Sequence, residues 1–354
     1  MLTQLQIKNL TVFPEASLNF ASGINIVVGE NGCGKSHLLK VMYAVIATGF
    51  DPRQTHLLHT ESTKPTQTSL QKAYADKLVA VLRPESLGRL ARRKQGAERC
   101  ELGFTFANSA LNAQFALSTR SKSEVQIENS PAEWQTKPPV FFPTRELLTL
   151  CPWFISLYDN TYVEFEETWR DTCSLLNAPA IKGQREKRIA ELLKPLEEAM
   201  GGRVFVDSKS GRFYLSITGE GNLEMPLVAE GLRKLAMLAR LISTGTLLEQ
   251  GYLFWDEPET NLNPKLIKLI AKVMLHLCQN GIQLFIATHS LFLLRELEIL
   301  KQERVFANIP CRYFALRPTE QGVQIEQGDQ LEALQTLALL DEELMQSDRY
   351  MQVG

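Results

Sequence analysis

The stretch "VVGENGCGKSHLLKVM", residues 27–42, decides the fold. Gly29, Gly34, Lys35 and Ser36 satisfy the pattern G-x-x-x-x-G-K-[ST], and the match lies between an apolar run and a helical pattern. In such a turn, backbone N–H groups surround phosphate oxygens, the lysine reaches the β- and γ-phosphates, and the serine hydroxyl binds Mg²⁺. We therefore predict a nucleoside triphosphate site formed by Gly29, Glu30, Asn31, Gly32, Cys33, Gly34, Lys35, Ser36 and His37.

Two carboxylates follow a second apolar run, in "GYLFWDEPETNLNP", residues 251–264. Asp256 and Glu257 end that run, and the carboxyl ends of parallel strands form the ligand-binding edge of a sheet. We expect Asp256 to hold Mg²⁺ together with Ser36, and Glu257 to orient or deprotonate the attacking water. The alternative is an acidic turn with no part in a site, but it leaves the phosphate-binding turn without a metal partner.

A third apolar run, "QLFIATHS", residues 283–290, ends at Thr288 and His289. A histidine at the same edge could hydrogen-bond the γ-phosphate and report its loss. Taken alone, it would be more simply explained as a structural histidine. Beside the other two motifs, His289 is a candidate catalytic residue together with Glu257.

The rest of the chain indicates how these motifs are arranged. Alternating patterns predict two strands in residues 2–20 and an antiparallel meander in residues 100–129, whereas residues 146–200 have a helical pattern. Strands then alternate with helices, which is typical of a parallel sheet covered on both faces. We predict an α/β fold with a mixed, mostly parallel sheet flanked by helices, an antiparallel β lobe and a helical insert.

Composition limits the possible functions. The 354 residues carry a formal net charge of -2, so nucleic-acid binding would need a local basic patch. Residues 89–94 and 182–188 are the candidates, with solvated helix faces as the alternative. The six cysteines form no C-x-x-C pair, which argues against a zinc site and for a reducing compartment. No signal-peptide pattern and no long apolar run is present, so we expect a cytoplasmic protein without a membrane span.

Four motifs taken in order, "GENGCGKS", "VAEGLRKL", "DEPETNLNP" and "FIATHS", resemble those of the ABC-type ATPases of the RecF, SMC and OLD kind, often named AAA family ATP-binding proteins. The resemblance implies a P-loop NTPase fold of the ABC-ATPase type and Mg²⁺-dependent hydrolysis of ATP. It also implies one domain, divided into a lobe of residues 1–145, a helical insert of residues 146–202 and a lobe of residues 203–354.

The same resemblance implies a homodimer, or a higher oligomer built from such dimers, that encloses ATP head to tail. Gly231 would then face the γ-phosphate bound by the partner, and residues 260–263 would form the D-loop. Thr144, Arg145 and Glu146 would take the place of the Q-loop, although that segment has no glutamine.

The signature segment also departs from the family pattern. Where the signature L-S-G-G has a serine, this sequence has Ala229. Backbone N–H groups at the start of the helix, helped by Arg233 or Lys234, would then make the contact with the partner's nucleotide. We therefore expect this contact to be weakened.

The parts that are missing narrow the biological hypothesis. The chain is too short for an SMC coiled coil or for the TOPRIM nuclease of OLD proteins, so a stand-alone ATPase head of RecF size is expected. Many stand-alone members of the group accompany a separate nuclease or toxin in bacterial anti-phage systems. We therefore expect an ATP-hydrolysing switch that dimerises around ATP and regulates a separate effector protein, a nuclease or toxin, in anti-phage defence. A RecF-like DNA-repair ATPase and a slow ATP-sensing scaffold are the alternatives.

Overall fold

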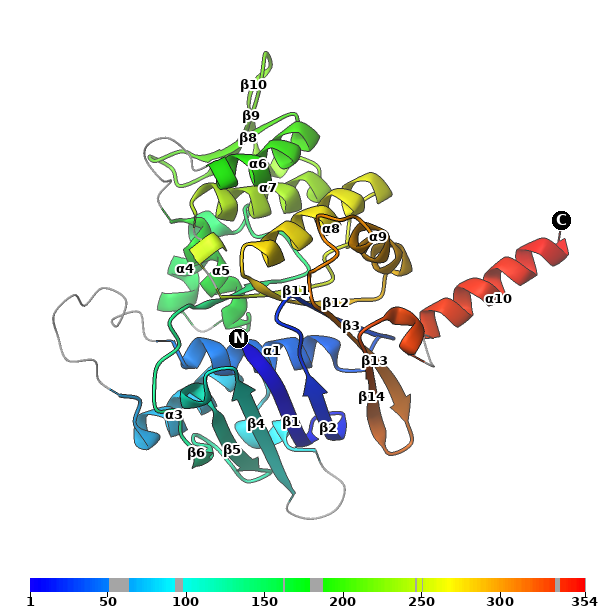
Figure 1. Ribbon diagram of the computed structural model, residues 1–354. Coiled ribbons are helices and arrows are strands. Elements are labelled where there is room, and N and C mark those ends of the chain that lie inside the picture. The colour runs from blue at the N-terminus through cyan, green and yellow to red at the C-terminus, as the bar shows by residue number, and fades with distance from the viewer. Residues whose placement is uncertain are drawn as a thin grey trace.

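A computed structural model of the chain describes residues 1–50, 64–92, 98–161, 163–178, 187–245, 247–249, 251–334 and 338–353. Two large sheets and two groups of helices form the body (Figure 1). Short 3₁₀ helices connect some of these elements at Leu87–Leu90, Ser109–Leu111, Met225–Leu227, Leu247–Glu249 and Leu331–Ala333.

The central sheet has the strand order β14-β13-β3-β12-β11-β7, and only β14 is antiparallel to its neighbour. Its strands are β3 (Ile24–Gly29), β7 (Pro139–Phe142), β11 (Tyr252–Asp256), β12 (Gln283–Thr288), β13 (Cys311–Thr319) and β14 (Gly322–Gly328). Every residue of β3, β11 and β12 is buried, which explains why these strands are continuous apolar runs in the sequence. The parallel register brings the carboxyl ends of these three strands to one edge.

One face of this sheet is covered by α1 (Lys35–Thr48), with α3 (Gln67–Leu82) beside it. Beyond α1 lies a five-stranded antiparallel sheet of order β2-β1-β4-β5-β6. Its strands are β1 (Leu2–Leu10), β2 (Phe13–Asn19), β4 (Arg99–Phe106), β5 (Ala113–Ser118) and β6 (Gln126–Asn129). Buried residues of α1, α3, the antiparallel sheet and the facing side of the central sheet form one apolar cluster. This is the antiparallel lobe that the sequence predicts.

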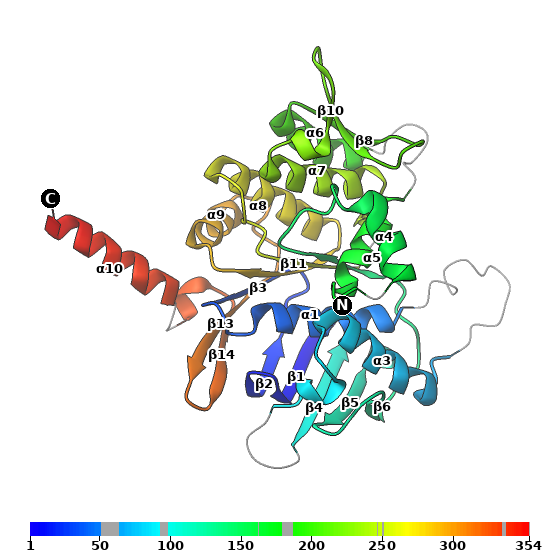
Figure 2. The ribbon, with the colours of Figure 1, turned by 180° about the vertical axis from the view of Figure 1, so that it is seen from behind.

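Helices cover the opposite face, as Figure 2 shows from behind. They are α4 (Cys151–Asn160), α5 (Glu167–Leu176), α6 (Lys187–Met200), α7 (Glu230–Ser243), α8 (Pro264–Gln279) and α9 (Leu291–Lys301). A three-stranded antiparallel sheet of β8 (Gly202–Val206), β9 (Phe213–Ile217) and β10 (Gly221–Glu224) packs on α6 and α7. The boundary expected after residue 202 therefore lies one residue inside β8. The predicted fold class, with its mixed sheet, β lobe and helical insert, is confirmed.

The helical insert is tied to the helix that follows the phosphate-binding turn. Asp171 of α5 accepts hydrogen bonds from the Tyr43 hydroxyl of α1 and from Lys77 Nζ of α3, both at 2.6 Å. Lys40 of α1 forms an ion pair with Glu166 at the start of α5. Because α1 starts at the turn, these contacts fix the insert relative to the candidate site.

The last helix, α10 (Ala338–Val353), extends away from the body in both views (Figures 1 and 2). Its side chains at residues 345–352 are all exposed. None of the helices in the described ranges is both long and apolar enough to cross a membrane.

Candidate active site

The phosphate-binding turn connects β3 to α1, and two of its glycines are required by close packing. A Cβ atom at Gly34 would lie 2.7 Å from Val12 Cγ2 and 2.9 Å from Phe13 Cζ, and the φ of 84° at Gly34 is in the left-handed region. A Cβ atom at Gly29 would lie 2.8 Å from the carbonyl oxygen of Leu316 in β13. The turn is thus held between the two sheets.

The start of α1 is arranged to attract an anion. Its N-cap, Gly34, provides no side-chain cap, and the first turn contains no acidic residue. Lys35 Nζ is nearly buried and donates to the carbonyl oxygens of Gly29 at 2.7 Å and Glu30 at 2.9 Å. Within the described part of the chain, no carboxylate pairs with this lysine. The positive end of the helix dipole and the ammonium group therefore act at the same place.

The other predicted residues of the turn lie on its two sides. Glu30, Asn31, Gly32 and His37 are exposed at the surface of the turn. Cys33 is buried in the apolar cluster beneath it, where it fills space. The side chains of the exposed residues are thus open to a ligand, whereas the side chain of Cys33 is not.

Asp256 is the last residue of β11 and is 7% exposed. Burial raises the pKa of its carboxyl group, and a hydrogen bond from the Ser36 hydroxyl opposes that shift. Its Oδ1 atom is buried and finds no hydrogen-bond partner among the described residues. A buried carboxylate oxygen without a partner, next to a hydroxyl, matches the all-oxygen ligand set that Mg²⁺ prefers. The side chains of Ser36 and Asp256 therefore fit a bound Mg²⁺.

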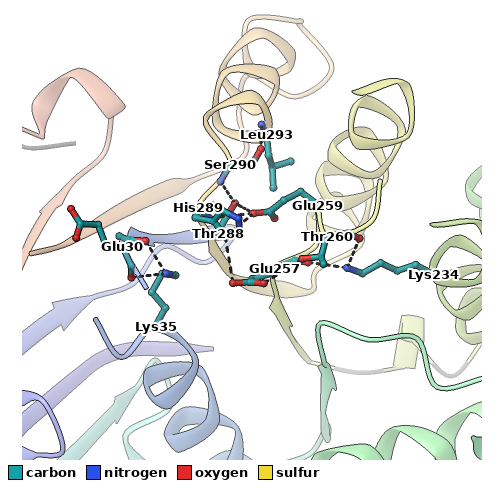
Figure 3. Close-up of polar contacts among 11 residues, drawn as sticks. Glu30, Lys35, Lys234, Glu257, Glu259, Thr260, Thr288, His289, Ser290 and Leu293 are labelled. Atoms are coloured by element: carbon teal, nitrogen blue, oxygen red, sulfur yellow. Dashed lines mark hydrogen bonds and ion pairs between the residues drawn. The ribbon is translucent and has the colours of Figure 1, made fainter. Parts of the chain in front are cut away.

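Glu257 and His289 meet at the same edge of the sheet, as Figure 3 shows. Glu257 has a positive φ of 48°, and its backbone N–H donates to the carbonyl oxygen of Ala287 at 2.8 Å. This left-handed conformation, uncommon for a residue with a side chain, turns the carboxylate out of the strand direction. Its Oε1 atom lies 3.4 Å from His289 Nδ1, and both side chains are partly exposed, at 27% and 48%. The two predicted catalytic residues are thus in contact and open to solvent.

Sequence reasoning missed Glu259. Its side chain is only 7% exposed, and its Oε1 atom accepts hydrogen bonds from the Thr288 hydroxyl at 2.6 Å and from the His289 backbone N–H at 3.2 Å. The same oxygen lies 3.7 Å from His289 Nδ1. The one signal in the sequence was a third carboxylate, two residues beyond Glu257.

The signature segment packs against its own chain. Ala229 is exposed and is the N-cap of α7, with no side-chain cap. A Cβ atom at Gly231 would lie 2.6 Å from the carbonyl oxygen of Asn261, so this glycine is needed for a close approach between α7 and the loop after β11. Gly231 is therefore not simply a partner-facing residue, because a larger side chain there would displace Asn261 of the same chain.

The two basic residues after Gly231, Arg233 and Lys234, do not lie where a contact with the partner's nucleotide would require them. Lys234 is 2% exposed, and its Nζ donates to the carbonyl oxygens of Glu257 at 2.8 Å and Thr260 at 3.2 Å. Burial lowers the pKa of Lys234 to about 8, although Glu259 and Glu257 oppose the shift. Because Lys234 is turned into its own chain, it does not reach a partner's phosphate in this structure.

Arg233 pairs instead with Glu146, at 3.4 Å between Nε and Oε1. Glu146 is buried and also accepts a hydrogen bond from the Thr149 hydroxyl at 2.7 Å. In the segment expected to replace the Q-loop, Glu146 thus joins α7, whereas Arg145 is exposed. This ion pair links the end of β7 to the signature helix.

The two basic segments proposed for nucleic acid are only partly described. Arg89 is paired with Glu85 at 2.6 Å, as expected for a solvated surface. Residues 93–97 and 181–186 lie outside the described residues.

Comparison with known proteins decides the family. A family profile described as "AAA domain, putative AbiEii toxin, Type IV TA system" matches residues 24–295, which include the phosphate-binding turn, both carboxylates and His289. The chain belongs to this family. As an AbiEii-type AAA protein it is an ABC-type nucleotide-binding ATPase, as its motifs predict.

Solved SMC heads have the same fold as this AbiEii-type AAA protein. One is an SMC head domain with an extended coiled coil from Pyrococcus furiosus, bound to the C-terminal domain of ScpA. It is 10% identical with a TM-score of 0.53, and the match covers 98% of this chain and 99% of that one. Another is an SMC head bound to the C-terminal winged-helix domain of ScpA, at 11% identity and a TM-score of 0.52, covering 95% and 99%. At these identities the likeness shows the fold alone.

Proposed function

We propose that this AbiEii-type AAA protein is a Mg²⁺-dependent ATP-hydrolysing switch that closes head to tail around ATP. The observation that carries the proposal is the meeting of Glu257 and His289, 3.4 Å apart, at the sheet edge where the phosphate-binding turn also begins. A binding module without chemistry would not need a carboxylate and an imidazole held together there.

Each residue has a distinct part in this proposal. The turn and Lys35 bind the phosphates of ATP through backbone N–H groups and one cation. Mg²⁺ held by Ser36 and Asp256 would neutralise charge on the β- and γ-phosphates. Glu257 orients the attacking water and accepts its proton, and His289 hydrogen-bonds the γ-phosphate.

The proposal of a dimer rests on the start of α7. Figure 3 shows Lys35 and Lys234 on opposite sides of Glu257, so α7 does not complete the turn of its own chain. Its N-cap, Ala229, is exposed and has no side-chain cap, and Leu227 just before it is 68% exposed. A second copy that presents ATP on its own turn fits this surface, because the free N–H groups of α7 would meet the γ-phosphate.

We further propose that ATP-dependent closure regulates a separate effector, a nuclease or a toxin, in anti-phage defence in the cytoplasm. The description of the family names a putative toxin and a type IV toxin–antitoxin system. The solved SMC heads are bound to domains of a separate protein, ScpA. Both support a head that acts with a partner. All 354 residues would form one ATPase domain, in homodimers or in larger assemblies of them.

The test separates binding from chemistry. In Glu257→Gln the size of the side chain is kept and its basicity is lost, so turnover should fall by at least ~10²-fold while ATP binding persists. Light scattering after size exclusion should then show an ATP-dependent dimer that Mg-ADP does not support. Glu303→Gln, at an exposed position, is the control and should behave as the parent does. Equal masses in both nucleotides with unchanged turnover would favour the sensing scaffold instead.

A further inference from the structure

We propose that Glu259 is a positioning residue that holds His289 against Glu257. The inference rests on the proposed function, since it assigns a role to Glu259 in the same hydrolysis. It concerns a carboxylate that does not itself meet the nucleotide.

The hydrogen bonds of Glu259 hold the backbone from which the His289 imidazole projects. Its Oε1 atom accepts from the Thr288 hydroxyl and from the His289 backbone N–H, at 2.6 and 3.2 Å. The imidazole Nδ1 lies 3.4 Å from Glu257 and 3.7 Å from Glu259. Both carboxylates thus face the same ring nitrogen, which leaves Nε2 for another partner.

The contacts continue beyond the histidine, as Figure 3 shows. The Thr288 hydroxyl also accepts from the Ser290 backbone N–H at 3.0 Å, and the Ser290 hydroxyl caps α9 by accepting from the Leu293 N–H at 3.2 Å. Glu259 therefore connects the loop after β11 to the start of α9, with the His289 peptide between them. Displacing the His289 backbone requires these hydrogen bonds to break.

Burial of Glu259 is difficult to explain by packing alone. An ionised carboxylate taken out of water loses favourable hydration, which a neutral side chain of similar size would not lose. Yet only one oxygen of Glu259 has partners among the described residues, because Oε2 is buried there without a hydrogen bond. The nearby charge of Lys234, whose pKa Glu259 raises, compensates in part. This arrangement provides a strong hydrogen-bond acceptor for the Thr288 hydroxyl and the His289 backbone N–H.

The same geometry distinguishes the two carboxylates. Glu257 is 27% exposed, and its Oε2 accepts a 3.3 Å hydrogen bond from the Thr260 hydroxyl. Glu259 is 7% exposed, and its accessible lone pairs are already used by two donors. Glu257 can therefore reach a water, whereas Glu259 acts through His289.

The experiment is a double-mutant cycle on the full-length protein. Glu259→Ala should lower kcat by about tenfold or more and leave KM for ATP within about twofold, because the histidine is misplaced but the phosphate-binding turn is intact. In a His289→Ala background, the same change should lower kcat by less than about twofold, because the imidazole through which Glu259 acts is already absent. Single-turnover assays with radiolabelled ATP keep the slow variants measurable.

Two conservative variants separate positioning from a general loss of structure. Glu259→Gln keeps an acceptor oxygen and should recover most of the lost kcat. Thr288→Val removes the hydroxyl donor without changing the shape, and should lower kcat in the same way, whereas Thr288→Ser should not. If Glu259→Ala fails to fold, the Gln, Val and Ser variants carry the test.

The inference is overturned if Glu259→Ala keeps the parental kcat, or if its full loss persists in the His289→Ala background. It is also overturned if Thr288→Val has no effect on kcat. In each case Glu257→Gln and His289→Ala still report on the hydrolysis in the proposed function, which fails if those variants keep turnover. The two failures are therefore distinguishable.

Discussion

Two helices begin at the candidate site without a side-chain cap, and they are not equivalent. Gly34 precedes α1 and Ala229 precedes α7, whereas α8 and α9 are capped by the side chains of Asn263 and Ser290. The first turn of α1 has no acid and carries Lys35, while α7 opens with Glu230 and turns its Lys234 into its own chain. The start of α1 thus carries by itself the groups that a phosphate site needs. In the proposed dimer, the start of α7 offers backbone N–H groups to the nucleotide bound by the partner.

The largest effect is expected at the first helix. Lys35→Ala should weaken ATP binding by about 100-fold, because it removes charge-assisted contacts to the phosphates. The free energy of unfolding should change by less than about 1 kcal/mol, since no carboxylate is left unpaired in the described part of the chain. Titration with a fluorescent ATP analogue measures the affinity. Lys265→Ala, an exposed lysine at the start of α8, is the matched control. Equal affinity in Lys35→Ala and the parent would remove the phosphate assignment.

A smaller effect is expected at the second helix. Ala229→Glu should lower ATP turnover by tenfold or more, because a carboxylate would face the partner's γ-phosphate where a preorganised donor normally acts. ATP affinity of the monomer should not change, and α7 tolerates an acid at its N-terminus. Ala229→Ser restores the hydroxyl of the family pattern and should turn over at least as fast as the parent. Parental turnover in Ala229→Glu would mean that α7 faces no phosphate.

The buried ammonium group of Lys234 in α7 should make the free energy of unfolding depend on pH. Its pKa is lowered from 10.5 to about 8 in the folded chain, so between these pH values the unfolded chain holds more protons. The contribution of Lys234 to the free energy of unfolding should therefore rise by about 1–2 kcal/mol between pH 7.5 and 9.5. Urea denaturation of the parent and Lys234→Met at both pH values measures it, because other titrations cancel in the difference. A difference that is the same at both pH values would contradict the buried position of the ammonium group.

The smallest effect is expected at Gly231. Alanine gains about 1 kcal/mol in helix propensity, but its Cβ would lie 2.6 Å from a backbone carbonyl oxygen that must move. Overpacking of this kind typically destabilises by about 1–3 kcal/mol, so Gly231→Ala should be slightly less stable than the parent. The midpoint temperature of thermal unfolding, compared between Gly231→Ala and the parent, measures this loss of stability. A stabilised variant would mean that α7 and the loop after β11 are free to separate.

Because a larger side chain at Gly231 would displace Asn261 of the same chain, Gly231→Arg is an unsuitable probe of the dimer, and Ala229 is the better position.

Local motifs could be interpreted from the sequence, and long-range contacts could not. Residues 27–42 contain a strand, a turn and a helix start, so their structure follows from neighbouring residues, and the fold class followed from the alternation of such units. The contact between Lys234 and Glu257 joins distant segments, and the helical pattern of α7 does not show which face packs on the loop. Lys234 was therefore expected to face outward, and it is buried.

The carboxylates of the second motif illustrate the same limit. Asp256, Glu257 and Glu259 look alike in the sequence, and strand alternation alone does not distinguish their roles. The positive φ at Glu257 ends the alternation, so that Glu257 remains partly exposed while Glu259 turns inward to Thr288. No residue type in the motif requires this conformation. The position of Asp256 could be predicted from the sequence, because the end of a buried strand fixes its place at the sheet edge.

The most direct measurement concerns whether one site is built from two chains. Lys35→Ala should turn over slowly because its own turn fails, and Ala229→Glu because it cannot complete the turn of its partner. In a mixed dimer, the intact turn of the Ala229→Glu chain meets the intact α7 of the Lys35→Ala chain. Mixing the two impaired variants should therefore raise turnover, up to about a quarter of the parental rate if copies pair at random. Turnover equal to the sum of the separate variants would show that each chain hydrolyses ATP alone, and would contradict the head-to-tail arrangement.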